Sequence, residues 1–190
     1  MNELEQYIQS YFGVPQEDLA KISPLFQLTR LKRGEYFLKT GQVCDKLSFQ
    51  RSGLIRVYIE TGEKDITQWV STQGYFLTDL SGIIFHRPSK YHIQALVDCE
   101  LYTIHKEDYN QLGSLIAKWH EQEKLFIAHC FTLLEDRIFA LLSKSAEQRY
   151  EHLFEQQKDL FNRVPLQYLA SMMGMTPETL SRLRRKKSVG

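Results

Sequence analysis

The segment that most constrains this chain is its last 27 residues (164–190), which carry the pattern of a helix, a tight turn and a second helix. Ala170 is small enough to let two helices approach closely. Four residues later, Gly174 can adopt the left-handed conformation that ends a helix. Thr176 is a good N-cap for the second helix, with Pro177 at its first position. Together these residues predict a helix-turn-helix.

The two predicted helices separate apolar from polar positions. The apolar positions are expected to face inward: Leu169, Met173, Met175, Leu180 and Leu183. The positions expected to face outward on the second helix are polar: Glu178, Thr179, Ser181, Arg182 and Arg185. The major groove of DNA accepts a short polar helix presented in this way. The alternative is a helical hairpin that only closes a globular domain, and the combined turn, cap and basic face favour DNA binding.

The distribution of charge supports this interpretation. The whole chain has a net charge of only +1. Residues 144–190 hold nine Lys/Arg and five Asp/Glu, whereas residues 1–143 hold fifteen and eighteen. Five of the six residues from Arg182 to Lys187 are basic, in direct continuation of the predicted second helix. This asymmetry is typical of a C-terminal segment that contacts phosphate.

Length and composition exclude several other classes. The chain of 190 residues has room for one large domain or two modest ones. No apolar run is long enough to span a membrane, and the acidic N-terminus has no signal-peptide core, so we expect a cytoplasmic protein. The widely spaced Cys44, Cys99 and Cys130 predict reduced thiols, with no zinc site, no four-cysteine cluster and no cofactor.

In the residues before the C-terminal segment, apolar positions first recur at helical spacing and then at every second residue. Residues 2–22 are expected to form helices, interrupted at residues 13–15 by Gly-Val-Pro. From about residue 25 to residue 104, turn signals separate short β-rich segments: Phe26–Leu31, Tyr36–Leu38, Leu47–Gln50, Leu54–Glu60, Asp65–Val70, Tyr91–Val97 and Glu100–Ile104. Many short strands at this spacing predict a sandwich or a jelly-roll barrel.

One long helix is predicted from about Lys106 to Ser143. Its apolar positions recur at intervals of seven: Leu112, Trp119, Phe126, Leu133 and Ala140. This stripe is longer than a small barrel needs as cover, which favours a homodimer through this helix over packing on its own barrel. Polar residues interrupt the flanking positions, so the seam is not an ideal coiled coil. A further helix is expected over residues 146–161, before the helix-turn-helix.

This order of elements resembles the cyclic-AMP receptor / fumarate–nitrate regulator (Crp/Fnr) family of bacterial transcription factors. Gly41, Gly53 and Gly74 occupy turn positions of that family's barrel. Residues 74–80 are similar to the start of its phosphate-binding cassette, and residues 178–182 are similar to its recognition helix, nearer the fumarate–nitrate branch.

The resemblance implies an α+β protein with three parts. The first is an N-terminal jelly-roll β-barrel like a cyclic-nucleotide-binding domain (residues 1–105), which would act as sensor. A dimerisation helix (106–143) and a helix-turn-helix DNA-binding domain (144–190) follow it.

The resemblance also implies a dimeric regulator that binds an inverted repeat in double-stranded DNA, with RNA polymerase as a further candidate partner. Glu178, Ser181 and Arg182 would contact base edges. Other residues of this helix would contact phosphates: Thr179, Arg184, Arg185, Lys186 and Lys187.

The cassette departs from the pattern of members that bind cyclic AMP. Those members carry Gly-Glu followed by Arg-Ser, whereas here Thr78-Asp79 and Ser89-Lys90 stand in these places. A buried phosphate without a cation is unfavourable. Lys90 is one position off, which on a strand directs it to the opposite face. We therefore expect no response to cyclic AMP; the effector pocket is degenerate, and any small-molecule effector is unknown.

Two other functional classes stay open. One is a signalling or scaffold module with a degenerate cyclic-nucleotide-binding domain and no DNA contact. We expect no long C-terminal wing after the motif, and this slightly weakens the interpretation as a DNA-binding protein. The other is a cupin-type metalloenzyme, which needs two or three His and a carboxylate around a metal. The strand region has no His-x-His pair, so the chain is predicted not to be an enzyme. His92 and His105 could line a haem pocket, but no other residue specifies one.

Overall fold

The structure is a computed structural model that describes the backbone of residues 1–188 and the side chains of residues 1–186. Two helices, α1 (Glu3–Phe12) and α2 (Gln16–Ile22), and the short 3-10 helix η1 (Ser23–Leu25) precede the barrel. Asn2 and Glu5 form a capping box at the start of α1. The two helices and the break between them agree with the sequence pattern. No helix in the described part of the chain is long and apolar enough to cross a membrane.

The barrel consists of two four-stranded antiparallel sheets, in the orders β1-β8-β3-β6 and β2-β7-β4-β5. Its elements are β1 (Gln27–Leu31), β2 (Tyr36–Leu38), β3 (Lys46–Ser52), β4 (Ile55–Glu60), β5 (Asp65–Ser71), β6 (Phe76–Leu77), α3 (Leu80–Phe85), β7 (His92–Ala95) and β8 (Cys99–His105). Strands distant in sequence lie side by side, which is the connectivity of a jelly roll. The predicted jelly-roll barrel is confirmed. Strand β6 and helix α3 were not predicted from the alternation of apolar and polar residues.

Apolar side chains fill the space between the two sheets. They form one buried cluster: Phe37, Leu38, Cys44, Ile55, Leu77, Ile93, Ala95, Cys99 and Leu101. A second cluster lies where α1 and α2 cover the barrel, and it includes Ile8, Phe12 and Phe49. The barrel thus has an apolar interior as well as an apolar outer surface that needs cover.

Two helices follow β8: α4 (Lys106–Leu115) and α5 (Trp119–Ser143). The prediction of one continuous helix from Lys106 to Ser143 is therefore wrong. Ile116 has an extended backbone (φ −122°, ψ 115°) that ends α4, and α4 folds against the start of α5. The Tyr109 ring meets Trp119 edge-on at 5.6 Å, and the Tyr109 hydroxyl donates to Glu123 at 2.8 Å. The apolar pattern keeps the same phase across the break, so the period of seven could not reveal it.

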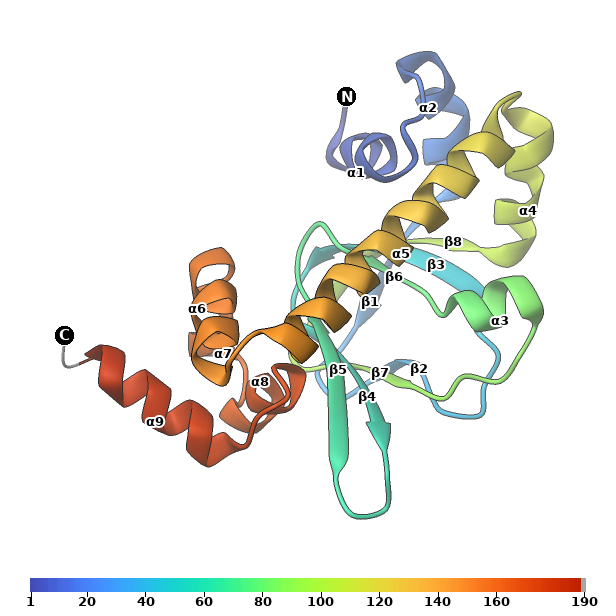
Figure 1. Cartoon of the computed structure of the whole chain (residues 1–190). Coiled ribbons are helices and arrows are strands. Elements are labelled where there is room, and N and C mark those ends of the chain that lie inside the picture. The colour runs from blue at the N-terminus through green and yellow to red at the C-terminus, as the bar shows by residue number, and fades with distance from the viewer. Residues whose placement is uncertain (189–190) are drawn as a thin grey trace.

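The first half of α5 packs against the N-terminal helices of the same chain (Figure 1). The rings of Phe126 and Trp119 stack on Phe12 of α1 at centroid distances of 4.4 and 5.0 Å. Phe126 is only 1% exposed, and Leu112 is buried in the same cluster. The assignment of Leu112, Trp119 and Phe126 to a dimer seam is therefore wrong. The N-terminal helices supply the surface that these residues cover.

The C-terminal part consists of α6 (Ala146–Gln156), α7 (Leu160–Arg163), α8 (Leu166–Met172) and α9 (Pro177–Ser188). The single helix predicted over residues 146–161 is two helices, because the chain leaves the helical conformation at Gln157. This break lets Phe161 turn inward and contact the rings of Tyr150 and Phe154 at 5.4 and 5.3 Å.

The C-terminal helices share one hydrophobic core with the barrel. Leu54 and Val70 of the barrel belong to the same buried cluster as Leu169 and Ala170 of α8. Figure 1 shows α8 beside β5, at one end of α5. The Ser171 hydroxyl accepts a hydrogen bond from the Thr67 amide at 2.9 Å. The helix-turn-helix therefore packs on β5 of the same chain.

The guanidinium of Arg137, in α5, forms hydrogen bonds where α8 packs on β5. It donates to the Gln68 carbonyl of β5 and, at 3.3 Å, to the Met172 carbonyl at the end of α8. It also lies 5.2 Å from the centre of the Trp69 ring. Burial lowers the pKa of Arg137, but its usual value is so high that it keeps its charge. One side chain of α5 thus contacts both the barrel and the helix-turn-helix.

Candidate nucleic-acid interface

Local sequence chemistry sets the turn between α8 and α9. Gly174 has φ 65°, in the left-handed region that glycine adopts readily. The Met175 amide donates to the Ala170 carbonyl at 3.0 Å, which closes α8. Thr176 Oγ1 accepts from the Thr179 amide at 3.2 Å and so caps α9, which begins at Pro177.

Packing within the motif fixes which face of α9 is free. Leu169, Ala170 and Leu180 are completely buried between α8 and α9. Met173 is buried, and Met175 and Leu183 are half-buried against the same core. The opposite side of α9 therefore faces away from the protein.

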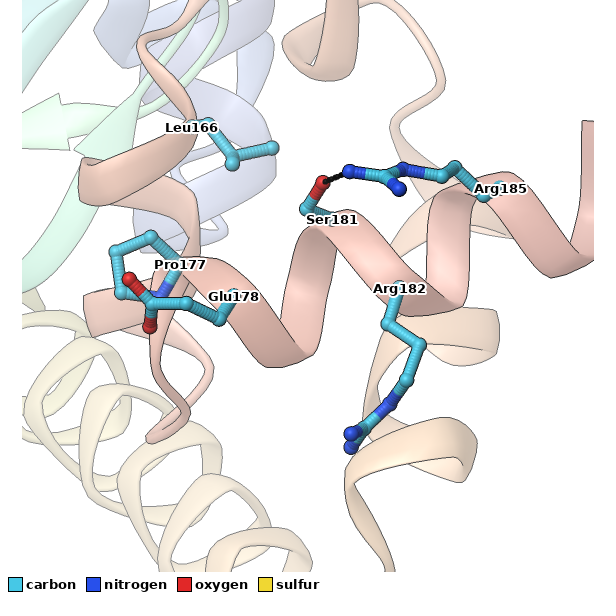
Figure 2. Close-up of a pocket in the computed structure, with 6 residues that line it drawn as sticks. All are labelled: Leu166, Pro177, Glu178, Ser181, Arg182 and Arg185. Atoms are coloured by element: carbon cyan, nitrogen blue, oxygen red, sulfur yellow. Dashed lines mark hydrogen bonds between the residues drawn. The ribbon is translucent and has the colours of Figure 1, made fainter.

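The outward face of α9 carries four polar residues at helical spacing. Glu178, Arg182 and Arg185 are exposed, and Ser181 is half-buried. With Leu166 and Pro177 they line a surface hollow of about 520 Å³ (Figure 2). Hydrogen bonds from its own backbone and from Thr176 lower the pKa of Glu178, so this side chain is an acceptor at neutral pH. This face can both donate to and accept from a ligand.

Arg185 belongs to this outward face. Its Nη2 donates to Ser181 Oγ at 3.4 Å, and Figure 2 shows the two side chains on the same side of α9. Arg185, which the sequence groups with the phosphate contacts, lines the same hollow as the residues expected to contact bases. The Ser181 hydroxyl accepts this hydrogen bond and can still donate its own proton to a base.

The other expected phosphate contacts lie beside this face. The Thr179 hydroxyl is engaged with Thr176 at 3.2 Å, and Arg184 is half-buried. The Lys186 ammonium pairs with Glu147 of α6 at 2.8 Å, so it is directed along the protein surface. The side chain of Lys187 lies outside the described residues.

Leu166 was not expected to belong to the site. It is the first residue of α8 and is half-buried at the edge of the hollow. The signal that could have found it is an apolar residue at a helix start, next to the polar face of the following helix. Turn and cap chemistry do not indicate which residues meet across the two helices.

The polar side chains of the degenerate cassette form hydrogen bonds with nearby backbone groups. The Thr78 hydroxyl donates to the Lys46 carbonyl at 3.0 Å, and Asp79 caps α3 by accepting from the Ser81 amide at 2.9 Å. Ser89 is 3% exposed, and its hydroxyl accepts from the Tyr91 amide at 3.0 Å. Lys90 is exposed. The side chains at these positions therefore bring no cation into the barrel interior.

The second half of α5 carries an exposed apolar face. Four exposed members follow the alternating spacing of three and four that coiled coils use: Phe131, Leu134, Ile138 and Leu141. Ile127 continues this spacing but is half-buried against the cluster formed with α1. Phe131 is 60% and Ile138 56% exposed. Leu133, the fourth residue expected in the dimer seam, is also exposed, but its spacing of seven residues from Phe126 places it outside this register. The stronger pattern through Trp119 and Phe126 concealed this second register.

Comparison with known proteins agrees with this architecture. Residues 28–114 match the family model of the cyclic nucleotide-binding domain. No curated protein matches the chain in sequence. FixK2 from Bradyrhizobium japonicum has a similar structure, with a TM-score of 0.73 at 14% identity, over 86% of this chain and 85% of that chain.

Two further solved structures are similar over most of both chains. The c-di-GMP-responsive global regulator CLP from Xanthomonas campestris gives a TM-score of 0.68 at 16% identity, over 92% of each chain. A transcriptional regulator assigned to the Crp/Fnr family from Eubacterium rectale gives 0.69 at 20% identity, over 97% of this chain and 88% of that chain. Residues 28–114 are therefore similar to a cyclic nucleotide-binding domain, and the fold of the chain is similar to that of these solved regulators.

Proposed function

We propose that this protein is a dimeric transcription regulator of the Crp/Fnr type, which binds an inverted-repeat operator through α9 of each subunit. The observation that carries the proposal is the outward face of α9, where Glu178, Ser181 and Arg182 share one side of a helix held by a helix-turn-helix. The guanidinium of Arg182 would donate to guanine O6 and N7, and Glu178 would accept from cytosine N4. Such a helix enters the major groove.

Phosphate contacts would give this site most of its affinity. Residues 144–190 have a net charge of +4, and each phosphate neutralised by Lys or Arg releases counterions from the DNA. The candidates remain those of the sequence: Thr179, Arg184, Arg185, Lys186 and Lys187. Lys186 would exchange its pairing with Glu147 for a phosphate, so its net contribution should be small.

The exposed apolar face of α5 would pair with the same face of a second copy. Its spacing of four and three residues suits two helices that pack side by side. A two-fold dimer would present two copies of α9 to half-sites about 34 Å apart, one turn of the duplex. We assign sensing to residues 1–105 and DNA binding to 144–190, and within 106–143 we assign dimerisation to the second half of α5. We expect a cytoplasmic protein that is not an enzyme and that has RNA polymerase as a candidate partner.

The regulator would not respond to cyclic AMP. Within the cassette, Ser89 stands where the neutralising Arg of responsive members lies, and its hydroxyl is already bonded to Tyr91. Lys90 is exposed, and Arg87 is exposed beside the Phe85 ring. A cyclic phosphate at the cassette would gain no counter-charge from Ser89 or from the exposed Lys90 and Arg87. Any effector therefore has a different chemistry.

The proposal is tested by selecting operators from random duplex DNA with the full chain and measuring affinity at several salt concentrations. We expect an inverted repeat, with affinity that falls steeply as salt rises. Arg182→Ala should lose preference for the selected sequence. Arg33→Ala, which removes an exposed arginine from the barrel, is the matched control and should bind as the wild type does. Absence of any sequence preference in the wild type would refute the proposal.

A further inference from the structure

We propose that the apolar wall of the hollow beside α9, formed by Leu166 and Pro177, contacts the 5-methyl group of a thymine in each operator half-site. This inference rests on the proposed function and names a specificity determinant within it. The hollow is lined by six residues, of which these two have no side-chain hydrogen-bonding atoms.

The geometry separates the apolar wall from the cation of Arg182. Figure 2 shows the Leu166 side chain on the side of α9 where Ser181 and Arg185 lie, whereas Arg182 extends away from it. Pro177 lies at the first turn of α9, next to Glu178. In a duplex bound to α9, the base pair that contacts Arg182 would therefore differ from the base pair that contacts the apolar wall.

The chemistry of the major groove leaves one base edge that suits this wall. Guanine, adenine and cytosine present hydrogen-bonding atoms there, and only thymine adds a methyl group. A polar base edge placed against Leu166 would lose its bonds to water without replacement. Burying one methyl group instead strengthens binding about four-fold.

The flanking charges favour DNA over a small apolar ligand or a protein as the occupant. The exposed Arg182 and Arg185 border the hollow, in the segment that carries the excess of positive charge. Their guanidinium groups would attract the phosphate backbone and bring base edges to the hollow. An uncharged apolar ligand would gain nothing from either arginine.

The experiment replaces each thymine of the selected operator, one at a time, with uracil. This change removes only the methyl group and keeps the base pair, and it leaves the folded protein untouched. We expect one thymine per half-site to be sensitive, with affinity reduced about four-fold for one half-site and about fifteen-fold for both. Other thymines should show smaller losses.

Protein variants assign the sensitive methyl group to the wall. Leu166→Ala and, separately, Pro177→Ala should reduce the loss caused by uracil at that position, whereas Arg33→Ala should keep it. Thermal unfolding checks that both variants fold. Specific binding with no sensitive thymine, or with unchanged sensitivity in both variants, overturns this inference and leaves the proposed function standing. Absence of binding to any duplex overturns the proposed function itself.

Discussion

The guanidinium of Arg56 in β4 lies 3.7 Å from the centre of the Tyr168 ring in α8. The same guanidinium lies 3.9 Å from the centre of the Tyr58 ring. Arg56 is only 3% exposed, yet its charge is compensated by hydrogen bonds to Thr67 at 2.9 Å and Asp65 at 3.0 Å. A buried cation in contact with two rings thus joins the barrel to the helix-turn-helix.

Replacing Tyr168 with Leu should loosen this junction. The variant loses the ring over the Arg56 guanidinium, so we expect the free energy of unfolding to fall by about 1–2 kcal/mol. Amide hydrogen exchange in α8 should become faster than in the wild type. Tyr168→Phe keeps a ring in place and is the matched control. Equal effects of the Leu and Phe variants would show that the stacked cation does not hold the domains together.

Placing a charge on the exposed face of α5 should abolish dimerisation without unfolding the subunit. Ile138→Asp would bury two uncompensated carboxylates near each other in a dimer, at a cost of several kcal/mol. Because Ile138 is 56% exposed in the single chain, the variant should keep its circular dichroism and sediment as a monomer. Leu28→Asp, at an exposed leucine of β1, is the control and should stay dimeric.

Two results would contradict the dimer prediction. One is a wild-type protein that sediments as a monomer at micromolar concentration. The other is an Ile138→Asp variant that stays dimeric. Phe126→Asp cannot replace this test, because Phe126 belongs to the core formed with α1 and its charge would unfold the subunit.

Local chemistry explains what the sequence could predict. Gly174, Thr176 and Pro177 act within a few residues of one another, so the turn and cap of the helix-turn-helix follow from the chain itself. The alternation of apolar residues likewise predicts the strands, since each sheet has one buried face. This pattern predicts many short strands but leaves a sandwich and a jelly roll open, and the resemblance to the Crp/Fnr family selects the jelly roll.

Partners distant in sequence explain what it could not predict. The stripe through Trp119 and Phe126 shows that one face of a helix is buried, but not whether α1 or a second copy covers it. The packing of α6, α8 and α9 likewise decides that Lys186 pairs with Glu147 and that Leu166 lines the hollow. Apolar periodicity cannot choose between such partners.

Cyclic AMP should not bind at micromolar concentration. The cassette offers the buried Ser89 hydroxyl, which is bonded to Tyr91, in place of a cation for the phosphate. Isothermal titration calorimetry with the full chain should therefore show no saturable heat. Micromolar affinity would contradict the prediction. In that case Lys90→Ala and Arg87→Ala would identify which cation reaches the phosphate.

Arg182→Ala and Lys186→Ala should affect DNA binding in different ways. Arg182 lies on the outward face of α9 with Glu178 and Ser181, so its loss should cost about 1–3 kcal/mol per half-site and relax the preference at one base pair. Lys186 lies beside this face and pairs with Glu147, so its loss should weaken binding to all sequences evenly. The salt dependence should then fall by at most about one counterion per subunit.

These two variants are compared on a selected operator and on scrambled DNA at several salt concentrations. Glu147→Gln is the companion variant, because it removes the carboxylate that competes for Lys186 and should raise the affinity for both DNAs. If Arg182→Ala weakens binding to both DNAs equally, α9 contacts the backbone and not the bases. The roles proposed for Glu178, Ser181 and Arg182 would then be wrong together, since all three depend on the same face of the helix meeting base edges.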